Sequence, residues 1–498
     1  MAHKTRQSIS SSSLFLIALV LLGLLYLYLS PPPPSSTHSS SSSRPLTKHT
    51  QPIRPISHSS QNPIQSTPNG AFQKRVIVVG DIHGDLSHAT RLLRTVGLLN
   101  LKSEWVGGEA ILVQTGDIVD RGRDTIALYR LMDNLRAQAV KTGGAVVSLL
   151  GNHELMNAFG DWRYVTKEDI ATVSQFFARP FSDSNAHSTS TSQFGGEAQR
   201  REALREGWIG QTWRTNYSIT ARVPLSQGFT SLPRSLTPPI PSYAASSPQT
   251  YVGDALPPSS EYDPFSHAAI SFVHGGIIPE YLHTLTGNPI EEINRMCVPS
   301  SIPSLLLPHS FHLPKKQIDD NSGSELLHSL LSTPSTHSLP STATPEQRFF
   351  WSEKGPMWDR SYALDEDEQE MCKRAEEACE ILGVRHLVMG HTPHFEGPVE
   401  RCGGKVLLID TGISRAYGGA ISATEFLYTL TPAPLDPSSP SSPEEEDVLD
   451  RGLRLRRRSK SPTTSRWLEE EVVTAWFVGD RNNEELARSE RFVDLPLD

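Results

Sequence analysis

The run Val76-Ile77-Val78-Val79-Gly80-Asp81-Ile82-His83-Gly84-Asp85 (VIVVGDIHGD) decides the fold class of this chain. Its first four residues are apolar and β-branched, which is typical of a strand that is buried on both faces. Its last six residues combine glycine, which permits sharp turns, with carboxylate and imidazole groups that bind divalent metal ions. The run therefore predicts a buried strand that ends in a loop of candidate metal-binding residues.

Apolar segments that follow this run alternate between helix and strand patterns. Residues 86–99 and 124–140 place apolar side chains at helical spacing, whereas residues 111–113 and 145–150 are short apolar runs of the strand type. The order βαβαβ predicts a parallel sheet that is covered by helices. Further strands are expected over residues 270–273, 386–389, 406–409, 424–431 and 472–478.

Five of the predicted strands run directly into polar motifs. After the first strand, these motifs are GDIVDRG (residues 116–122), GNHE (151–154), HGG (274–276) and GHT (390–392). Because ligands bind outside the carboxyl ends of the strands in an open α/β sheet, we expect the five loops to converge at one place. One such motif is weak support for a site, but five in succession after apolar strands indicate a site for Mn, Fe or Zn.

As a set, these motifs resemble those of the metal-dependent phosphoprotein phosphatases of the calcineurin-like phosphoesterase superfamily. More narrowly, residues 151–165 (GNHELMNAFGDWRYV), the run HGGIIPEY from His274 and residues 355–360 (GPMWDR) resemble the Shewanella-like protein phosphatases. The resemblance covers about residues 72–431. It implies a calcineurin-like α/β metallophosphoesterase fold, in which a central β-sandwich of mixed sheets is flanked by helices.

The resemblance also implies a site for two divalent metal ions and assigns their ligands. Asp81 and His83 would hold the first ion, and Asp117 would bridge both ions. The coordination of the second ion would be completed by Asn152, His274 and His391. Two adjacent ions lower the pKa of a shared water, so the bridging hydroxide would attack the phosphorus directly.

Catalytic and phosphate-binding roles follow from the same resemblance. His153 would be the general acid that protonates the leaving oxygen, and Asp120 would orient it and raise the pKa of its imidazole. Arg121 and Arg360 would bind the phosphoryl oxygens, because a planar guanidinium donates to two oxygens at once. Three further candidates for the neighbourhood of the site are Asn157, Arg163 and Arg415.

The expected function is that of a phosphomonoesterase that acts on phosphoproteins. The sequence does not distinguish phosphoserine or phosphothreonine from phosphotyrosine as the substrate. A same-fold hydrolase of nucleotide substrates, such as a diadenosine tetraphosphatase or a phosphodiesterase, is the first alternative. An inactive, membrane-tethered binding module is the second, although no ligand or general acid is missing from the motifs. The net charge of −9 gives no indication of a basic face, so no nucleic-acid partner is expected.

Residues 14–29 (LFLIALVLLGLLYLYL) are uncharged and apolar, which predicts a transmembrane signal anchor over residues 14–30. Lys4 and Arg6 precede this run, and no Lys or Arg follows it until Arg44. Residues 1–13 are therefore expected in the cytoplasm, and the catalytic domain in the lumen of the secretory pathway or outside the cell. A cleaved signal peptide is the alternative, and the prolines at 31–34 disfavour it.

Ser- and Pro-rich tracts divide the rest of the chain. Residues 31–71 predict a disordered stalk, and the phosphatase domain is expected over residues 72–431, with low-complexity insertions at about 182–192, 224–260 and 298–344. Residues 432–465 predict a disordered loop, and residues 466–498 a strand and tail that complete the domain. The four cysteines are expected to be unpaired, because Cys372 and Cys379 lie too far apart on a helix to bridge.

Overall fold

The computed structural model describes residues 71–177, 195–205, 207–226, 267–296, 344–433 and 464–496. All of them belong to one unit of the chain, Asn62–Asp498. The predicted transmembrane segment, the stalk up to residue 70 and most of the predicted insertions lie outside the described residues. Among the residues that are described, no helix combines the length and the apolar character needed to cross a membrane.

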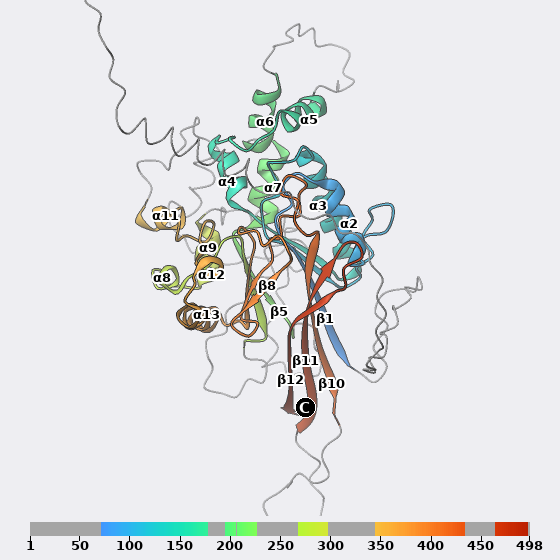
Figure 1. The fold of residues 1–498 in the computed structure, drawn as a ribbon, viewed down its shortest axis with the longest axis vertical. Coiled ribbons are helices and arrows are strands. Elements are labelled where there is room, and N and C mark those ends of the chain that lie inside the picture. Colours follow the sequence, from blue (N-terminus) through green and yellow to red (C-terminus); the bar gives the residue numbers. More distant parts are fainter. Residues whose placement is uncertain are drawn as a thin grey trace, which may run out of the picture. The chain divides into compact units, whose positions relative to one another are not determined.

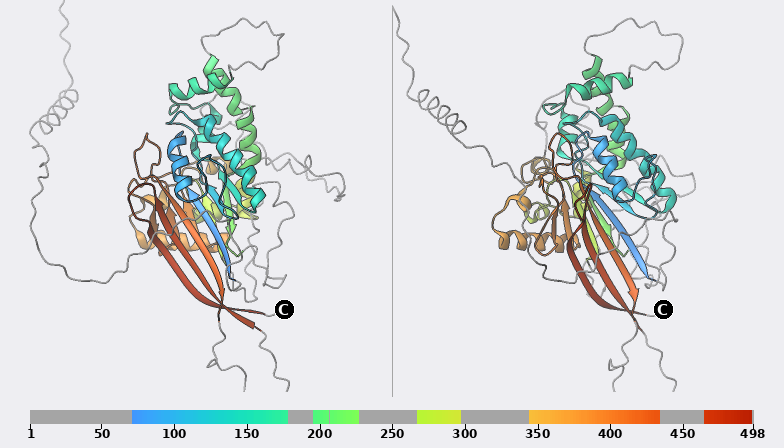
Figure 2. Two further views of the ribbon diagram at one scale, coloured as in Figure 1. Left: turned by 90° about the vertical axis from the view of Figure 1, so that its right-hand side faces the viewer. Right: turned by 45° about the vertical axis from the view of Figure 1, so that its right-hand side comes forward.

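The strands of the described residues form two sheets (Figure 1). From edge to edge, the first sheet contains β12 (Glu484–Pro496), β11 (Thr464–Phe477), β10 (Ser422–Pro432), β1 (Phe72–Val79), β2 (Ile111–Gln114), β3 (Ala145–Leu149) and β4 (Tyr217–Ser218). The second sheet contains β5 (Thr220–Pro224), β6 (Ala269–Val273), β7 (His386–Met389), β9 (Val406–Leu408) and β8 (Val399–Arg401). Figure 2 shows β10, β11 and β12 as long strands beside β1.

Strand β1 is buried on both of its faces, as its apolar run predicts. It pairs in parallel with β2, and β2 pairs in parallel with β3, whereas β10 joins β1 in the antiparallel direction. Val76 and Val78 belong to the core between the two sheets, which they share with Phe272 of β6. Ile77 and Val79 belong to the core beneath the helices. Both faces are therefore covered, which explains the unbroken run of apolar residues.

Helices form two groups on opposite sides of the strands (Figure 1). The first group comprises α2 (Leu86–Thr95), α3 (Thr125–Ala139) with the short 3-10 turn Val140–Thr142, α4 (Asn152–Phe159), α5 (Lys167–Phe177), α6 (Gly195–Arg205) and α7 (Trp208–Asn216). The second group comprises α8 (Pro279–Leu282), α9 (Pro289–Arg295), α11 (Pro345–Phe350), α12 (Ser361–Leu364) and α13 (Glu368–Leu382). The predicted β-sandwich of mixed sheets flanked by helices is confirmed.

The described residues add two details to the predicted domain layout. Pro224 was expected to begin a low-complexity insertion, but it is the last residue of β5 and pairs with Ala269 of β6. After residue 466 the chain was expected to form one strand and a tail, but β11 and β12 form an antiparallel hairpin. Strand β12 lies at the edge of its sheet and carries many charged residues, which is common for edge strands and hides their apolar pattern.

A disulfide joins Cys372 of α13 to Cys402, which follows β8. The expectation of unpaired cysteines is therefore wrong for this pair, whereas Cys379 is a buried free thiol and Cys297 lies outside the described residues. Spacing along a single helix could not reveal the bond, because the partner comes from 30 positions further along the chain.

A buried ionic network attaches the C-terminal hairpin to the second sheet. Glu471 of β11 accepts hydrogen bonds from His386 Nε2 (2.8 Å) and Arg385 Nη1 (3.0 Å). Glu469 accepts from Arg385 Nη2 and from the Tyr428 hydroxyl, each at 2.7 Å. Burial alone would raise the pKa of Glu471, but the bonds from His386 and Arg385 outweigh it and hold the pKa below its ordinary value of 4.5. The carboxylate therefore stabilises the fold in its charged form.

Glu471→Gln is expected to lower the free energy of unfolding at about pH 7 by about 3 kcal/mol, because it removes the counter-charge of a buried pair. Stability that comes from a lowered pKa is fully present above pH 4.5 and is lost as the pH falls through the folded-state pKa. Denaturant unfolding at a series of pH values measures the difference, which should shrink below pH 4.5. A difference that does not change with pH would contradict the assignment. Glu485→Gln, at an exposed position on β12, is the control and should leave stability unchanged.

Candidate active site

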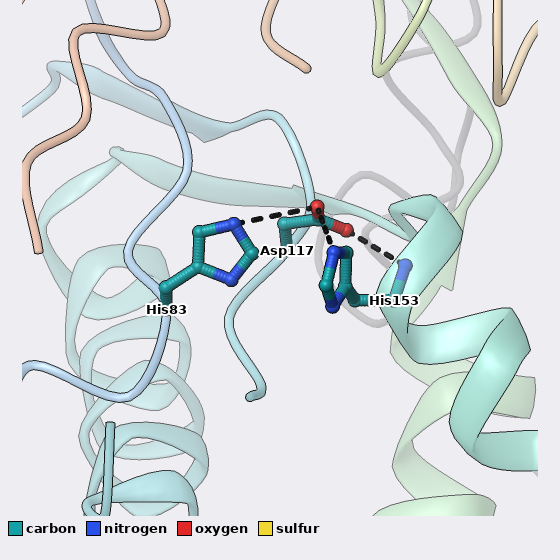
Figure 3. A group of neighbouring side chains, drawn as sticks. All are labelled: His83, Asp117 and His153. Carbon is teal, nitrogen blue, oxygen red and sulfur yellow. Dashed lines mark hydrogen bonds and ion pairs between the residues drawn. The ribbon is translucent and has the colours of Figure 1, made fainter. Parts of the chain in front are cut away.

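The loops that follow β1, β2, β3 and β6 meet at the carboxylate of Asp117. Its Oδ2 lies 3.6 Å from His83 Nε2, 3.8 Å from His153 Nε2 and 3.4 Å from His274 Nε2. Figure 3 shows the carboxylate between the imidazoles of His83 and His153. The convergence that the sequence predicts is therefore found, and one carboxylate lies at its centre.

The loop after β7 completes a second group of donors around Asp117. One ligand atom each from Asp117, His274 and His391 lie within 4.8 Å of one another. Asn152 Oδ1 is 2.8 Å from His274 Nε2. Within the described part of the chain, the buried Nε2 of His391 has no hydrogen-bond partner. A buried nitrogen without a partner is costly unless it binds a ligand, so this group fits a metal ion.

Asp81 lies beside a second buried carboxyl group, that of Asp410 after β9. Burial, together with the charges of Asp410 and Asp117, raises the pKa of Asp81 well above its ordinary value. Burial also raises the pKa of Asp410 to about 6. Carboxyl groups that repel one another in this way favour a divalent cation nearby. Asp410 was missed in the sequence, although it follows the predicted strand at 406–409 as the other ligands follow theirs.

The imidazoles around Asp117 are suited to metal binding. Burial lowers the pKa of His83 to about 4 and holds that of His391 well below its ordinary value. Neutral imidazole nitrogens and carboxylate oxygens are the donors that Mn, Fe and Zn accept. The structure brings together the six residues that were predicted as ligands: Asp81, His83, Asp117, Asn152, His274 and His391.

Glu154 holds the loops after β2 and β3 together from beneath. Its buried carboxylate accepts from the backbone N–H groups of Gly151 (2.7 Å), Asp117 (2.8 Å) and Ile118 (2.8 Å). The Tyr129 hydroxyl also donates to it, at 3.2 Å. A Cβ on residue 151 would lie 2.0 Å from Asp117 Oδ1, so only glycine permits this approach. Glu154 therefore fixes the position of the central carboxylate.

Five non-glycine residues of the motif loops have a left-handed backbone. Their φ angles are 44° at His83, 55° at Asp117, 68° at Asp120, 64° at Arg121 and 68° at His391. Residues with a Cβ adopt this region rarely and at a cost. Such strain persists where the surrounding structure determines the conformation, and it is typical of functional sites.

His153 is bonded on one side and faces the donor group on the other. Its Nδ1 lies 2.7 Å from Asp120 Oδ2, and Asn157 Nδ2 donates to Asp120 Oδ1 at 2.9 Å. Burial lowers the pKa of His153, but the charges of Asp117 and Asp120 outweigh it and raise the pKa above its ordinary value. A protonated imidazole that is held in a fixed orientation is suited to general-acid catalysis.

The two predicted phosphate-binding arginines are both half-buried and both fixed in place. Arg360 Nη1 donates to the backbone oxygen of His391 (2.8 Å) and to Thr392 Oγ1 (2.9 Å). The Arg121 guanidinium carbon lies 4.1 Å from the ring centre of Tyr164 and 5.2 Å from that of Tyr417. The two tyrosines were not identified in the sequence, because stacking on an arginine leaves no local pattern.

The three further residues that were expected near the site differ in what they contact. Asn157 reaches the site through its bond to Asp120. Arg163 is exposed and pairs with Asp161. Arg415 donates from Nε and Nη2 to the two carboxylate oxygens of Asp85, the residue that caps α2.

Glu154→Gln is expected to lower the free energy of unfolding by about 2–4 kcal/mol, because an amide nitrogen would then face backbone N–H donors in the interior. Chemical denaturation measures the loss. Glu168→Gln, an exposed change on α5, is the matched control and should leave stability unchanged. Equal stabilities for the two variants would contradict the role of Glu154.

Three comparisons relate this chain to known proteins. The family model for calcineurin-like phosphoesterases matches residues 74–395. An uncharacterized protein of Schizosaccharomyces pombe (strain 972 / ATCC 24843) is 32% identical over 347 residues, which are 69% of this chain and 74% of that protein. Shewanella-like protein phosphatase 2 of Arabidopsis thaliana is 38% identical over 118 residues, 23% of this chain and 29% of that protein. A solved cold-active protein tyrosine phosphatase is 20% identical with a TM-score of 0.43, over 72% of this chain and 75% of that chain. The sequence matches confirm the resemblance that the motifs indicated.

Proposed function

Because the chain belongs to the calcineurin-like phosphoesterase family, we propose that it is a two-metal phosphatase whose substrates are phosphoproteins. The observation that supports this most directly is the position of Asp117, whose Oδ2 faces His83, His153 and His274 within 3.8 Å. The same oxygen faces an imidazole of each predicted metal position, so Asp117 would contribute to both. Similarity to the Shewanella-like protein phosphatases supports a phosphorylated protein side chain as the substrate.

The residues divide between two metal positions that share Asp117. Asp81 and His83 would hold one ion, and the ligands of the other would be Asn152, His274 and His391. When bound, two such ions supply a nucleophilic water and positive charge at the phosphoryl oxygens.

His153 supplies the proton that the leaving oxygen needs. Asp120 holds Nδ1, so Nε2 is the nitrogen that is turned toward Asp117. Transfer of that proton to the alkoxide or phenoxide completes the cleavage of the P–O bond.

Arg121 and Arg360 bind the phosphoryl oxygens. Tyr164 stacks against the guanidinium of Arg121, and the His391 carbonyl holds one nitrogen of Arg360. Both groups are therefore oriented before substrate arrives, which reduces the entropy lost on binding.

Hydrolysis of p-nitrophenyl phosphate and of phosphothreonine and phosphotyrosine peptides by the purified, Mn²⁺-loaded chain tests this proposal. Asp117→Asn is expected to abolish hydrolysis. His153→Asn should reduce the rate on the peptides by about 10²- to 10⁴-fold, and less on p-nitrophenyl phosphate, whose leaving group needs little protonation. The ratio of the two peptide rates identifies the preferred side chain.

Asp161→Asn, at a carboxylate that pairs with the exposed Arg163, is the control and should keep full activity. A wild-type chain that binds Mn²⁺ but cleaves none of these esters would contradict the proposal. Cleavage of dinucleotides by that chain would support the nucleotide alternative, and no turnover on either class would support an inactive binding module.

We also propose that residues 14–30 anchor the chain in a membrane of the secretory pathway, with the catalytic domain in the lumen or outside the cell. The apolar run and the charges before it support this orientation. The disulfide between Cys372 and Cys402 adds support, because disulfides persist mainly in oxidising compartments.

Protease treatment of sealed microsomes that contain the full chain tests the orientation. The catalytic domain should be protected until detergent opens the vesicles, and Cys372 and Cys402 should resist alkylation until a reductant is added. Digestion of the domain in sealed vesicles would place it in the cytoplasm and contradict the proposal.

A further inference from the structure

Arg200 is a buried cation that has no role in the proposed mechanism. It lies on α6, and its side chain is 0% exposed. Its Nη1 donates to Asp169 of α5. Its Nη2 lies 3.0 Å from Asn157 Oδ1 and 3.6 Å from Asp120 Oδ1. The guanidinium therefore connects α5 to the group that supports His153.

The bond from Arg200 holds the oxygen end of the Asn157 amide. Because Nη2 donates to Oδ1 of Asn157, the amide nitrogen of Asn157 is turned toward Asp120, to which it donates at 2.9 Å. The same nitrogen lies 2.9 Å from the backbone oxygen of His153. An asparagine amide without a fixed partner could present either its oxygen or its nitrogen to Asp120. The His153 carbonyl holds the nitrogen on one side, and Arg200 holds the oxygen on the other.

The positive charge of Arg200 also lies close to the buried carboxylate of Asp120. The carboxylate of Asp120 is 0% exposed, and a buried charge is costly unless it is paired and hydrogen-bonded. Its neighbours are His153, Asn157 and, at 3.6 Å, the guanidinium of Arg200. Asp169 pairs with the other side of that guanidinium. The guanidinium therefore offsets the charge of Asp120 at Oδ1, while Oδ2 keeps its bond to Nδ1 of His153.

We propose that Arg200 is a positioning residue for proton transfer to the leaving oxygen. It holds Asn157 and Asp120 so that His153 keeps Nε2 turned toward the reacting group. This inference rests on the proposed phosphatase function. It places a determinant of the general acid on α6, a helix outside the five motifs.

The test compares Arg200→Met with wild type in the Mn²⁺-loaded full chain, on a phosphothreonine peptide and on p-nitrophenyl phosphate. On the peptide, kcat is expected to fall by about 10- to 100-fold while KM stays within about twofold, because only the protonation step is impaired. On p-nitrophenyl phosphate, the loss should stay below about threefold. In a His153→Asn background, Arg200→Met should add less than about twofold on the peptide, because both changes act through the same group.

Arg201→Met is the matched control on the same helix. Arg201 stacks on Trp162, with its guanidinium carbon 4.9 Å from the ring centre, and its loss should leave both rates unchanged. Arg200→Met alone leaves Asp169 buried without its cation, so the double variant Asp169→Asn with Arg200→Met removes the pair together. Thermal unfolding and Mn²⁺ binding by calorimetry show whether the double variant is folded, and it should reproduce the selective loss on the peptide.

Two results would overturn the inference while leaving the phosphatase function intact. One is an equal loss on both esters in a double variant that unfolds at the wild-type temperature and binds Mn²⁺ normally. The other is a full additional loss in the His153→Asn background. Absence of hydrolysis by the wild-type chain would instead overturn the proposed function, and this inference with it.

Discussion

The buried carboxylate of Asp117 constrains the rest of the site. It is 2% exposed, and its charge helps to raise the pKa values of the neighbouring buried carboxyl groups of Asp81 and Asp410. Carboxylates in a low-dielectric interior need opposite charge or hydrogen bonds. The neutral imidazole of His83 offers a lone pair but little charge, so a divalent cation is the partner that this set of donors fits best. The glycine that permits the loops to approach and the strained backbone of the motif loops are consequences of packing these groups so tightly.

A second layer of bonds fixes the direction in which each group points. Glu154 determines where the backbone of Asp117 lies, because its carboxylate accepts hydrogen bonds from four backbone N–H groups of the two loops. Asp120 determines which nitrogen of His153 faces the site. These supporting carboxylates are themselves held by partners from helices, including Tyr129 of α3 and, through Asn157, Arg200 of α6. Precision at the site therefore depends on helices that contribute no predicted ligand.

Much of this arrangement could be predicted from the sequence, because it depends on local patterns. Apolar strand runs followed by Asp, His or Asn revealed five loops, and the rule that parallel strands end at one edge placed them together. Contacts between distant segments could not be predicted in this way. Cys402 lies in the turn between β8 and β9, which brings it to Cys372 of α13. Tyr417 and Arg121 are distant in the sequence and come into contact only in the folded chain. Arg200 lies in the polar run GGEAQRREALR, where an exposed position is the normal expectation.

Strand direction also determines where two long connections leave and re-enter the sheets relative to the catalytic loops. Strand β6 runs toward His274, and its first residue, Ala269, pairs with Pro224 at the end of β5. The chain between β5 and β6 therefore leaves and re-enters the sheet at the edge opposite the site. The connection between β10 and β11 begins beyond Pro432, which pairs with Trp467 at the end of β10 far from the loop after β1. The rule that gathers the ligands at one end of the strands thus places the described ends of both connections at the other end of the strands.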